Sequence, residues 1–182
     1  MDSNLIEAFW HSDHKVYGRR LKPLTLRHAF VLASADNPLV TGSRAVTRED
    51  TLQAVEICSR EATFFLRGKS PSWLARQITT FFAITDPKGP EKFAAYLSDY
   101  CTSPKVWKSE GGSAVKSHFT VATVAGLCQW LGIDVDRAWE MTLGEANFLI
   151  AAAIEQSPHA SIDLVSEREI ALSEMLDREE AA

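Results

Sequence analysis

The stretch "EMTLGEANFLIAAAIEQSP" (residues 140–158) decides the fold class, because it repeats a phrase from "KPLTLRHAFVLASADNPL" (residues 22–39). In both stretches, Thr-Leu-x-x-Ala opens an apolar run that ends near a proline. The side chain of Thr25 or Thr142 can accept a hydrogen bond from the backbone N–H two or three residues ahead. Each phrase therefore predicts the start of a helix.

The two predicted helix starts differ in how complete their caps are. Thr142 with Glu145 forms a capping box, in which each side chain satisfies a backbone N–H of the other residue. Thr25 with His28 keeps only half of that arrangement. An internal duplication is the alternative explanation of the repeated phrase. Because the shared positions are too few to support a duplication, and good caps resemble one another, we interpret the phrase as helix-initiation chemistry.

The helices that follow the two caps are expected to have different surroundings. Residues 143–154 are apolar on almost every side, which predicts a helix in the core. The helix after Thr25 carries Arg27 and His28 in its first turn, so we expect that end to be solvated.

The middle of the chain also shows helix signals. Thr47 followed by Asp50 is typical of an N-cap with acids in the first turn, and Ser70 before Pro71 predicts another start. A cluster of prolines and glycine at residues 86–90 predicts a break between two helices. Apolar residues recur at helical spacing between these signals, at Leu52, Val55, Ile57, Leu74, Ile78, Phe81, Phe82, Phe93, Tyr96, Leu97 and Tyr100.

Residues 119–131 are apolar nearly all round, which predicts a central buried helix with Trp130 in the core and Gly132 at its end. Alternation over strand length is nowhere convincing. We therefore predict an all-α fold, with a compact multi-helix domain at residues 1–160 and a charged amphipathic helix at residues 161–182.

The predicted C-terminal helix has a narrow apolar stripe that Glu169 interrupts. Such a helix can dock on its own domain or lie in the groove of a partner, and the sequence leaves both open. Residues 163–182 hold seven acidic and two basic residues, whereas residues 15–27 hold basic residues and no acid. The two ends can attract each other within one molecule or between neighbours.

Residues 102–117 form the longest predicted loop, with a proline, two glycines and mixed charge. Trp107 lies inside it, and tryptophan is enriched at the centres of protein interfaces. Packing back on the domain is the alternative. The candidate protein-interaction residues are Trp107, Ile162, Val165, Leu172, Met175, Leu176, Arg19 and Arg20.

Composition excludes several classes of function. The hydrophobic fraction is 46% and the charged fraction is 24%, as in soluble globular proteins, and no apolar run is long enough to cross a bilayer. The acidic beginning lacks the order of a signal peptide, so we expect a cytoplasmic protein without membrane contact.

A net charge of −5 disfavours nucleic-acid binding. The three cysteines are widely spaced, which is typical of reduced thiols.

A metal site is the main enzymatic alternative. Glu7, His11 and His14 would share one face of a helix, and three such groups can hold zinc or iron in a small metalloenzyme. No second ligand pair follows, and no nucleophile motif or phosphate loop has the required spacing. We therefore predict no catalytic, cofactor-binding or metal-binding residue, and no cofactor.

Two segments carry a resemblance to a known family. "RRLKPLTLRHAFVLASADNPLV" and "VATVAGLCQWLGIDVDRAWEMTLGEANFLIAAAIEQ" resemble small helical proteins of tailed-bacteriophage structural modules. The phrase Ala-Trp-Glu-Met-Thr-Leu-Gly-Glu-Ala at residues 138–146 is similar to one that opens a late helix in tail assembly chaperone-like proteins. Thr142 stands where that family usually has proline, and either residue can begin a helix. The resemblance covers about a third of the chain and leaves out residues 47–117.

The resemblance implies a non-enzymatic protein that keeps an aggregation-prone tape-measure protein soluble during tail assembly, in the cytoplasm of a bacterial host. It implies protein partners and a tendency to form homo-oligomers. The matching phrase shapes a helix, so no functional residue is carried over from the family. A virion structural or connector subunit of the tail or neck, retained in the particle, is the alternative.

Overall fold

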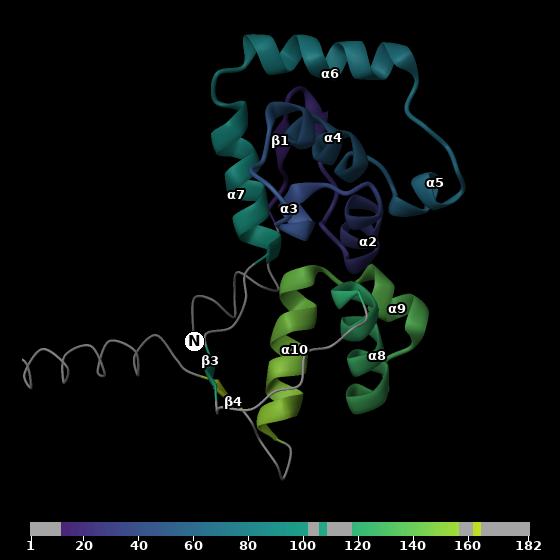
Figure 1. Ribbon diagram of the computed structural model, residues 1–182, viewed down its shortest axis with the longest axis vertical. Coiled ribbons are helices and arrows are strands. Elements are labelled where there is room, and N and C mark those ends of the chain that lie inside the picture. Colours follow the sequence, from purple (N-terminus) through teal and green to yellow (C-terminus); the bar gives the residue numbers. More distant parts are fainter. Residues whose placement is uncertain (1–11, 102–105, 109–117, 157–161, 165–182) are drawn as a thin grey trace, which may run out of the picture.

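Helices dominate the chain, which confirms the predicted all-α class (Figure 1). The structure is a computed structural model that describes residues 12–101, 106–108, 118–156 and 162–164. In chain order the elements are β1 (Lys15–Val16), β2 (Arg19–Arg20), α2 (Leu26–Ser34), α3 (Pro38–Thr41), α4 (Arg48–Cys58), α5 (Ala62–Leu66), α6 (Trp73–Thr85), α7 (Gly89–Cys101), β3 (Val106–Lys108), α8 (Phe119–Leu131), α9 (Val135–Glu140), α10 (Leu143–Glu155) and β4 (Ile162–Leu164).

The helices form two groups that share α2 (Figure 1). Val31 and Leu32 of α2 belong to an apolar cluster with the β1–β2 hairpin, α4 and α7. Leu26, at the start of the same helix, belongs to a second cluster with α8, α9 and α10. A helix that contributes to both clusters couples the two groups, since its burial depends on both.

The two repeated phrases meet in space. Thr25 and Thr142 pair as an isolated antiparallel bridge. The N–H of Leu26 donates to the carbonyl of Met141 at 2.9 Å, and the N–H of Leu143 donates to the carbonyl of Leu24 at 3.2 Å. An N-cap residue adopts an extended conformation before its helix begins, so two N-caps can pair as short strands do. The phrase therefore also joins the two groups of helices.

The predicted caps are confirmed in detail. Thr142 and Glu145 form the full capping box, with the Thr142 N–H donating to the glutamate carboxylate at 2.8 Å. Thr47 and Asp50 form a second full box at the start of α4. Gly132 ends α8 in the left-handed conformation that favours glycine. The start of α6 is a correction, since Ser72 caps it and the helix begins at residue 73, two residues beyond the predicted start.

The solvated start predicted for the first helix is wrong. His28 is buried, and its two ring nitrogens lie 2.9 Å from the Thr25 hydroxyl and 2.8 Å from the carbonyl of Arg60. Because a carbonyl can only accept, Nε2 carries the proton and Nδ1 accepts from Thr25. Arg27 lies between Asp136 and Glu140 of α9. Both polar residues are therefore covered by elements that pack on α2 from elsewhere in the sequence.

Burial of His28 predicts a loss of stability in mild acid. Desolvation lowers the pKa of His28 from its ordinary value of 6.5. The unfolded chain then binds the proton more readily than the folded chain, so the stabilisation is complete above pH 6.5 and declines as the pH falls below it. Urea unfolding midpoints measured from neutral to mildly acidic pH should fall in the native chain and fall less in His28→Gln. An equal slope in both proteins would contradict the assignment.

The predicted burial of residues 119–131 is only partly correct. The bounds of α8 agree, and Val124 and Leu127 are buried against the second cluster. Trp130, however, is 52% exposed and therefore does not lie in the core as predicted. Helices α2, α9 and α10 pack against α8 on one side, and Trp130 lies outside that contact.

Two predictions about the C-terminal part are also corrected. Residues 106–108, predicted as loop, and residues 162–164, predicted as helix, form β3 and β4 and pair antiparallel, with Trp107 opposite Asp163. Pairing between strands so far apart in sequence leaves no local signal. The remaining residues of the predicted C-terminal helix lie outside the described residues.

Candidate protein-docking surface

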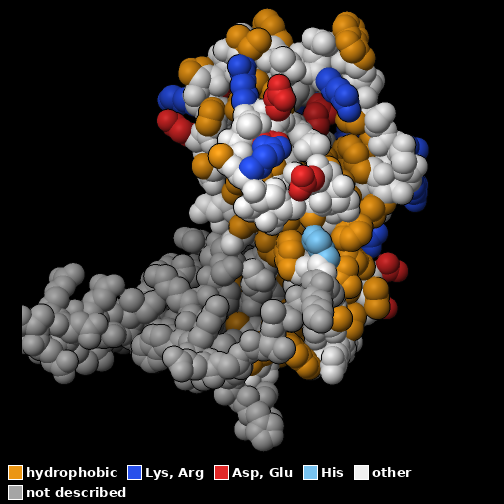
Figure 2. All heavy atoms as spheres, viewed as in Figure 1, with side chains coloured by type: hydrophobic (Ala, Val, Ile, Leu, Met, Phe, Trp, Pro, Cys, Tyr) orange, Lys and Arg blue, Asp and Glu red, His pale blue; other side chains and the backbone are white. Residues whose placement is uncertain are grey.

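Helix α6 places its large apolar side chains on the surface. Leu74, Ile78, Phe81 and Phe82, here called the α6 stripe, are 60%, 42%, 62% and 41% exposed. Large apolar side chains at this spacing ordinarily form the side of a helix that faces the core. Hydrophobic side chains project along the edge of the molecule that α6 forms (Figure 2). The structure therefore reverses the usual orientation of an amphipathic helix.

Small side chains face the protein instead. Ala75 and Thr79 are buried, and Ala83 is half-buried against the first cluster. Such residues allow the α6 backbone to approach α4 closely, as close packing requires. The small side of α6 is therefore its inner side. Leu74, Ile78 and Phe81 keep exposed surface within the described residues, while Phe82 also packs against Gly18 of the hairpin.

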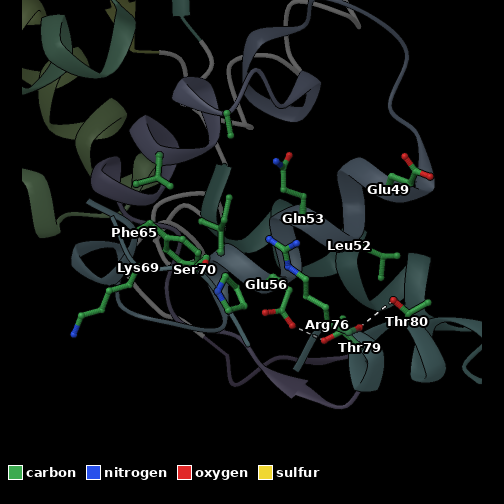
Figure 3. A pocket seen from close by; sticks show the side chains of 14 residues that line it. Glu49, Leu52, Gln53, Glu56, Phe65, Lys69, Ser70, Arg76, Thr79 and Thr80 are labelled. Atoms are coloured by element: carbon green, nitrogen blue, oxygen red, sulfur yellow. Dashed lines mark hydrogen bonds between the residues drawn. The ribbon is translucent and has the colours of Figure 1, made fainter. Parts of the chain in front are cut away.

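A polar network holds α6 in this orientation, and Figure 3 draws one of its bonds, between Thr79 and Glu56. The Thr79 hydroxyl donates to Glu56 Oε1 of α4 at 2.5 Å and accepts from Arg19 Nε at 3.0 Å. Arg19 also donates through Nη2 to the carbonyl of Ala75 at 2.7 Å and to Glu56 Oε1 at 3.2 Å. These hydrogen bonds involve charged groups and are partly buried, so they are stronger than bonds between neutral groups. Most amphipathic helices are attached to their domain by an apolar stripe. Helix α6 is attached by hydrogen bonds between its small side and the ion pair of Arg19 and Glu56.

Glu56 is the carboxylate at the centre of this network. Its side chain is 10% exposed, and Oε2 has no hydrogen-bond partner among the described residues. Oε2 is closed off from solvent and faces Arg60 Nε at 4.0 Å. Two arginines therefore compensate the charge of one buried carboxylate, which is a structural arrangement.

The turn between β1 and β2 contacts the C-terminal end of α6 and the N-terminal end of α7. Gly18 has a φ of 72°, and a Cβ placed there would lie 2.7 Å from the ring of Phe82. Tyr17 is buried against Gly89, where an added Cβ would clash with the tyrosine ring. The two glycines therefore allow close contact, and the hairpin fixes the C-terminal end of α6.

A pocket of about 550 Å³ lies beside α6 (Figure 3). Leu52 and Ile57 of α4 and Phe65 of α5 supply apolar lining, while Arg76 and Thr80 of α6 form one side. The pocket lies on the flank of α6 away from the stripe. It adds a hollow that a partner's side chain can enter next to the helix.

The surroundings of α6 are basic. Residues 67–92 contain five basic and two acidic side chains. Lys92 pairs with Asp86 at 2.8 Å, whereas Arg67, Lys69 and Arg76 form no ion pair within the described part of the chain. Lys69 and Arg76 line the pocket beside α6, so a partner that enters this pocket meets positive charge there.

The candidate residues from the sequence do not gather at this surface. Arg19 lies in the α6 network, and Arg20 is exposed and pairs with Asp13 at 2.8 Å. Trp107 lies in β3 and Ile162 in β4. Val165, Leu172, Met175 and Leu176 lie outside the described residues.

The α6 stripe is the part of the surface that sequence reasoning missed. Its period was detected, but the period does not say whether a face points inward. One signal was present in the composition of α6, because Trp73 and Ile84 outside the stripe are also apolar and Arg76 is the sole charged residue of the helix. A helix with so few charges has no obvious solvent side, which fits a surface that a partner covers.

Of the three hypothesised metal ligands, the structure describes His14 alone. His14 Nε2 lies 2.7 Å from Asp99 Oδ2 and its ring meets Tyr96 edge-on. Glu7 and His11 lie outside the described residues. No group of three potential ligands occurs where the structure describes the chain, and the search there also finds no helix long and apolar enough to span a membrane.

The exposed α6 stripe does not by itself indicate a family. Comparisons of the chain with protein-family models, with curated proteins and with solved structures found no match.

Proposed function

We propose that this protein is a non-enzymatic assembly factor, similar to tail assembly chaperones, that binds a helical segment of a partner protein along α6. The single observation that carries the proposal is the exposure of the α6 stripe. The resemblance at residues 138–146 supports the class of partner, a tape-measure protein in the cytoplasm of a bacterial host. The proposed site needs no cofactor and no catalytic residue.

The stripe has the form of a helix-docking surface. Side chains at positions i, i+4, i+7 and i+8 are the anchors by which an amphipathic helix is recognised along its length. Aromatic side chains bury roughly 150–250 Å² each, so a docked helix would cover several hundred Å² here. About 400 Å² corresponds to roughly 10 kcal/mol before the costs of association are subtracted. That is enough for a reversible complex.

The chemistry of the partner follows from the surface. A long tape-measure protein has helical stretches with apolar faces, which aggregate unless they are covered. The cations around α6 favour stretches with acidic flanks, because complementary charge speeds encounter and fixes orientation. The expected complex therefore weakens as salt concentration rises.

Co-expression with a tape-measure protein from the same tail module tests the proposal. The native chain should raise the soluble yield of that protein, and Ile78→Ser with Phe81→Ser should reduce the yield to the level seen without the chain. Val46→Ser with Leu66→Ser is the matched control, since it removes two exposed apolar side chains away from α6. The control should leave the yield unchanged.

Two results would count against the proposed function. The first is a stripe variant that keeps the tape-measure protein soluble as well as the native chain does. The second is recovery of the chain in stoichiometric amount from purified particles, measured by mass spectrometry, because a chaperone leaves before assembly is complete. That result would assign the chain to the structural subunits of the tail or neck.

A further inference from the structure

The pocket beside α6 lies at the edge of the first apolar cluster (Figure 3). Val31 and Ile57 belong to that cluster, and the partly buried Leu52 and Phe65 pack against it. All four side chains line the pocket, so the lining is mainly aliphatic. The volume of about 550 Å³ lies within the range of roughly 300–1,000 Å³ that is usual for small-molecule sites. An apolar chain that enters this pocket extends the cluster and leaves water.

Two hydrogen-bond donors of the pocket have no acceptor among the described residues. One is the guanidinium of Arg76, whose side chain runs from α6 toward Gln53 of α4 (Figure 3). The other is the NH₂ group of Gln53. Asn37 Oδ1 accepts from the N–H of Leu39 at 3.1 Å, so Asn37 Nδ2 donates to Gln53 Oε1 at 2.8 Å. Gln53 therefore keeps its NH₂ group for a ligand that accepts hydrogen bonds.

The charge that the pocket offers to a ligand is positive. Glu56 accepts from Arg19 at 3.2 Å, and its Oε2 faces Arg60 Nε at 4.0 Å, so its negative charge is compensated. Glu49 is exposed in the first turn of α4, where the helix N-terminus offsets a negative charge. Lys69 also lines the pocket but points away from the other labelled side chains (Figure 3). The guanidinium beside Gln53 is therefore the group placed to bind an anion, and a carboxylate supplies two acceptor oxygens.

We propose that this pocket binds a medium-chain aliphatic carboxylate. Its carboxylate accepts hydrogen bonds from Arg76 and Gln53, and its chain lies against Val31, Ile57 and Phe65. The site goes beyond the proposed function, since the pocket lies on the flank of α6 away from the stripe. Residues of α2, α4, α5 and α6 all line the pocket, so a bound ligand adds to the contacts between α6 and the rest of the domain.

Nuclear magnetic resonance of the full-length chain with octanoate as the probe tests the site. Nuclear Overhauser contacts should join the octanoate chain to the methyl groups of Val31 and Ile57, and the side-chain NH₂ resonances of Gln53 should shift. 1-Octanol has the same chain without the charge and should bind about tenfold more weakly, because a hydrogen bond to a charged group is the stronger one. Octylamine should bind more weakly than octanol, since its ammonium meets the guanidinium of Arg76.

Variants separate the charge of the site from its apolar lining. Arg76→Gln should weaken octanoate binding about tenfold and leave octanol binding unchanged. Arg137→Gln is the matched control, because it removes an exposed arginine of α9 outside the pocket, and it should leave octanoate binding unchanged. Ala35→Phe places a ring at the exposed C-cap of α2, which lines the pocket, and should block octanoate and octanol alike.

Four results would overturn the inference. The first is octanol or octylamine binding as tightly as octanoate, because the charge then selects nothing. The second is an unchanged octanoate affinity in Arg76→Gln. The third is contacts of octanoate with Leu24 and Leu97 only, which line a separate apolar cavity of about 290 Å³. The fourth is loss of octanoate binding in Ile78→Ser with Phe81→Ser, which would place the ligand on the stripe. If that variant binds octanoate but does not solubilise the client, both proposals stand; if it does both, only the proposed function fails.

Discussion

Replacing Glu56 by alanine is expected to lower the free energy of unfolding by about 3 kcal/mol, because it leaves the charges of Arg19 and Arg60 uncompensated. The carboxylate is the acceptor on which both Thr79 and Arg19 converge. Breaking a buried ion pair costs about 3–5 kcal/mol. The lower end applies here, since the Arg19 side chain is 24% exposed and keeps some contact with water. Urea unfolding of both proteins measures the difference.

The position of α6 should respond to the same substitution. Since the network holds α6 through Thr79 and the carbonyl of Ala75, its amide hydrogens should exchange faster in Glu56→Ala than those of α2. Glu49→Ala is the control on the same helix, because that side chain is exposed and its loss costs less than about 1 kcal/mol. Equal losses for the two variants would show that the network does not hold α6.

Replacing Leu26 by alanine is expected to lower the free energy of unfolding by about 2–5 kcal/mol, the range for a leucine deleted from a packed core. The side chain has no exposed surface and packs in the cluster of α8, α9 and α10, while its helix continues into the other cluster. The cavity would therefore lie where the two groups of helices meet. Thermal unfolding followed by circular dichroism and by calorimetry measures the change.

Leu66→Ala is the matched control for Leu26→Ala, because the same atoms are removed from a side chain that is 51% exposed. It should cost well under half as much. Both variants should keep a single transition, since α2 belongs to both clusters and neither group of helices unfolds alone. Two separated transitions in Leu26→Ala would mean that the bridge of Thr25 and Thr142 does not couple the groups.

Most helix boundaries could be predicted because they follow from local chemistry. Thr47, Thr142 and Gly132 act through groups within a few residues, so their roles are visible in the sequence. The false start at Ser70 has the same origin, since two serines flank Pro71 and either can cap. The β3–β4 pair was missed because its strands are short and far apart in the chain.

For the α6 stripe, the sequence predicted the helical spacing of the apolar residues and not the direction in which they point. The apolar period of Leu74, Ile78 and Phe81 is evident in the sequence, but its direction depends on the rest of the protein. Glu56 and Arg19 come from distant segments and bind the opposite side of the helix, and no local signal links them to Thr79. A periodic stripe defines a face of a helix and does not define what that face meets.

The sequence by itself determined the all-α class, the caps and the breaks, because these depend on backbone groups that neighbouring side chains satisfy. Only the tertiary structure decided that Thr25 and Thr142 pair, that His28 is buried and that the α6 stripe faces outward. These features arise where distant segments meet. Their energies come from burial and charge compensation across the fold, which a local pattern cannot specify.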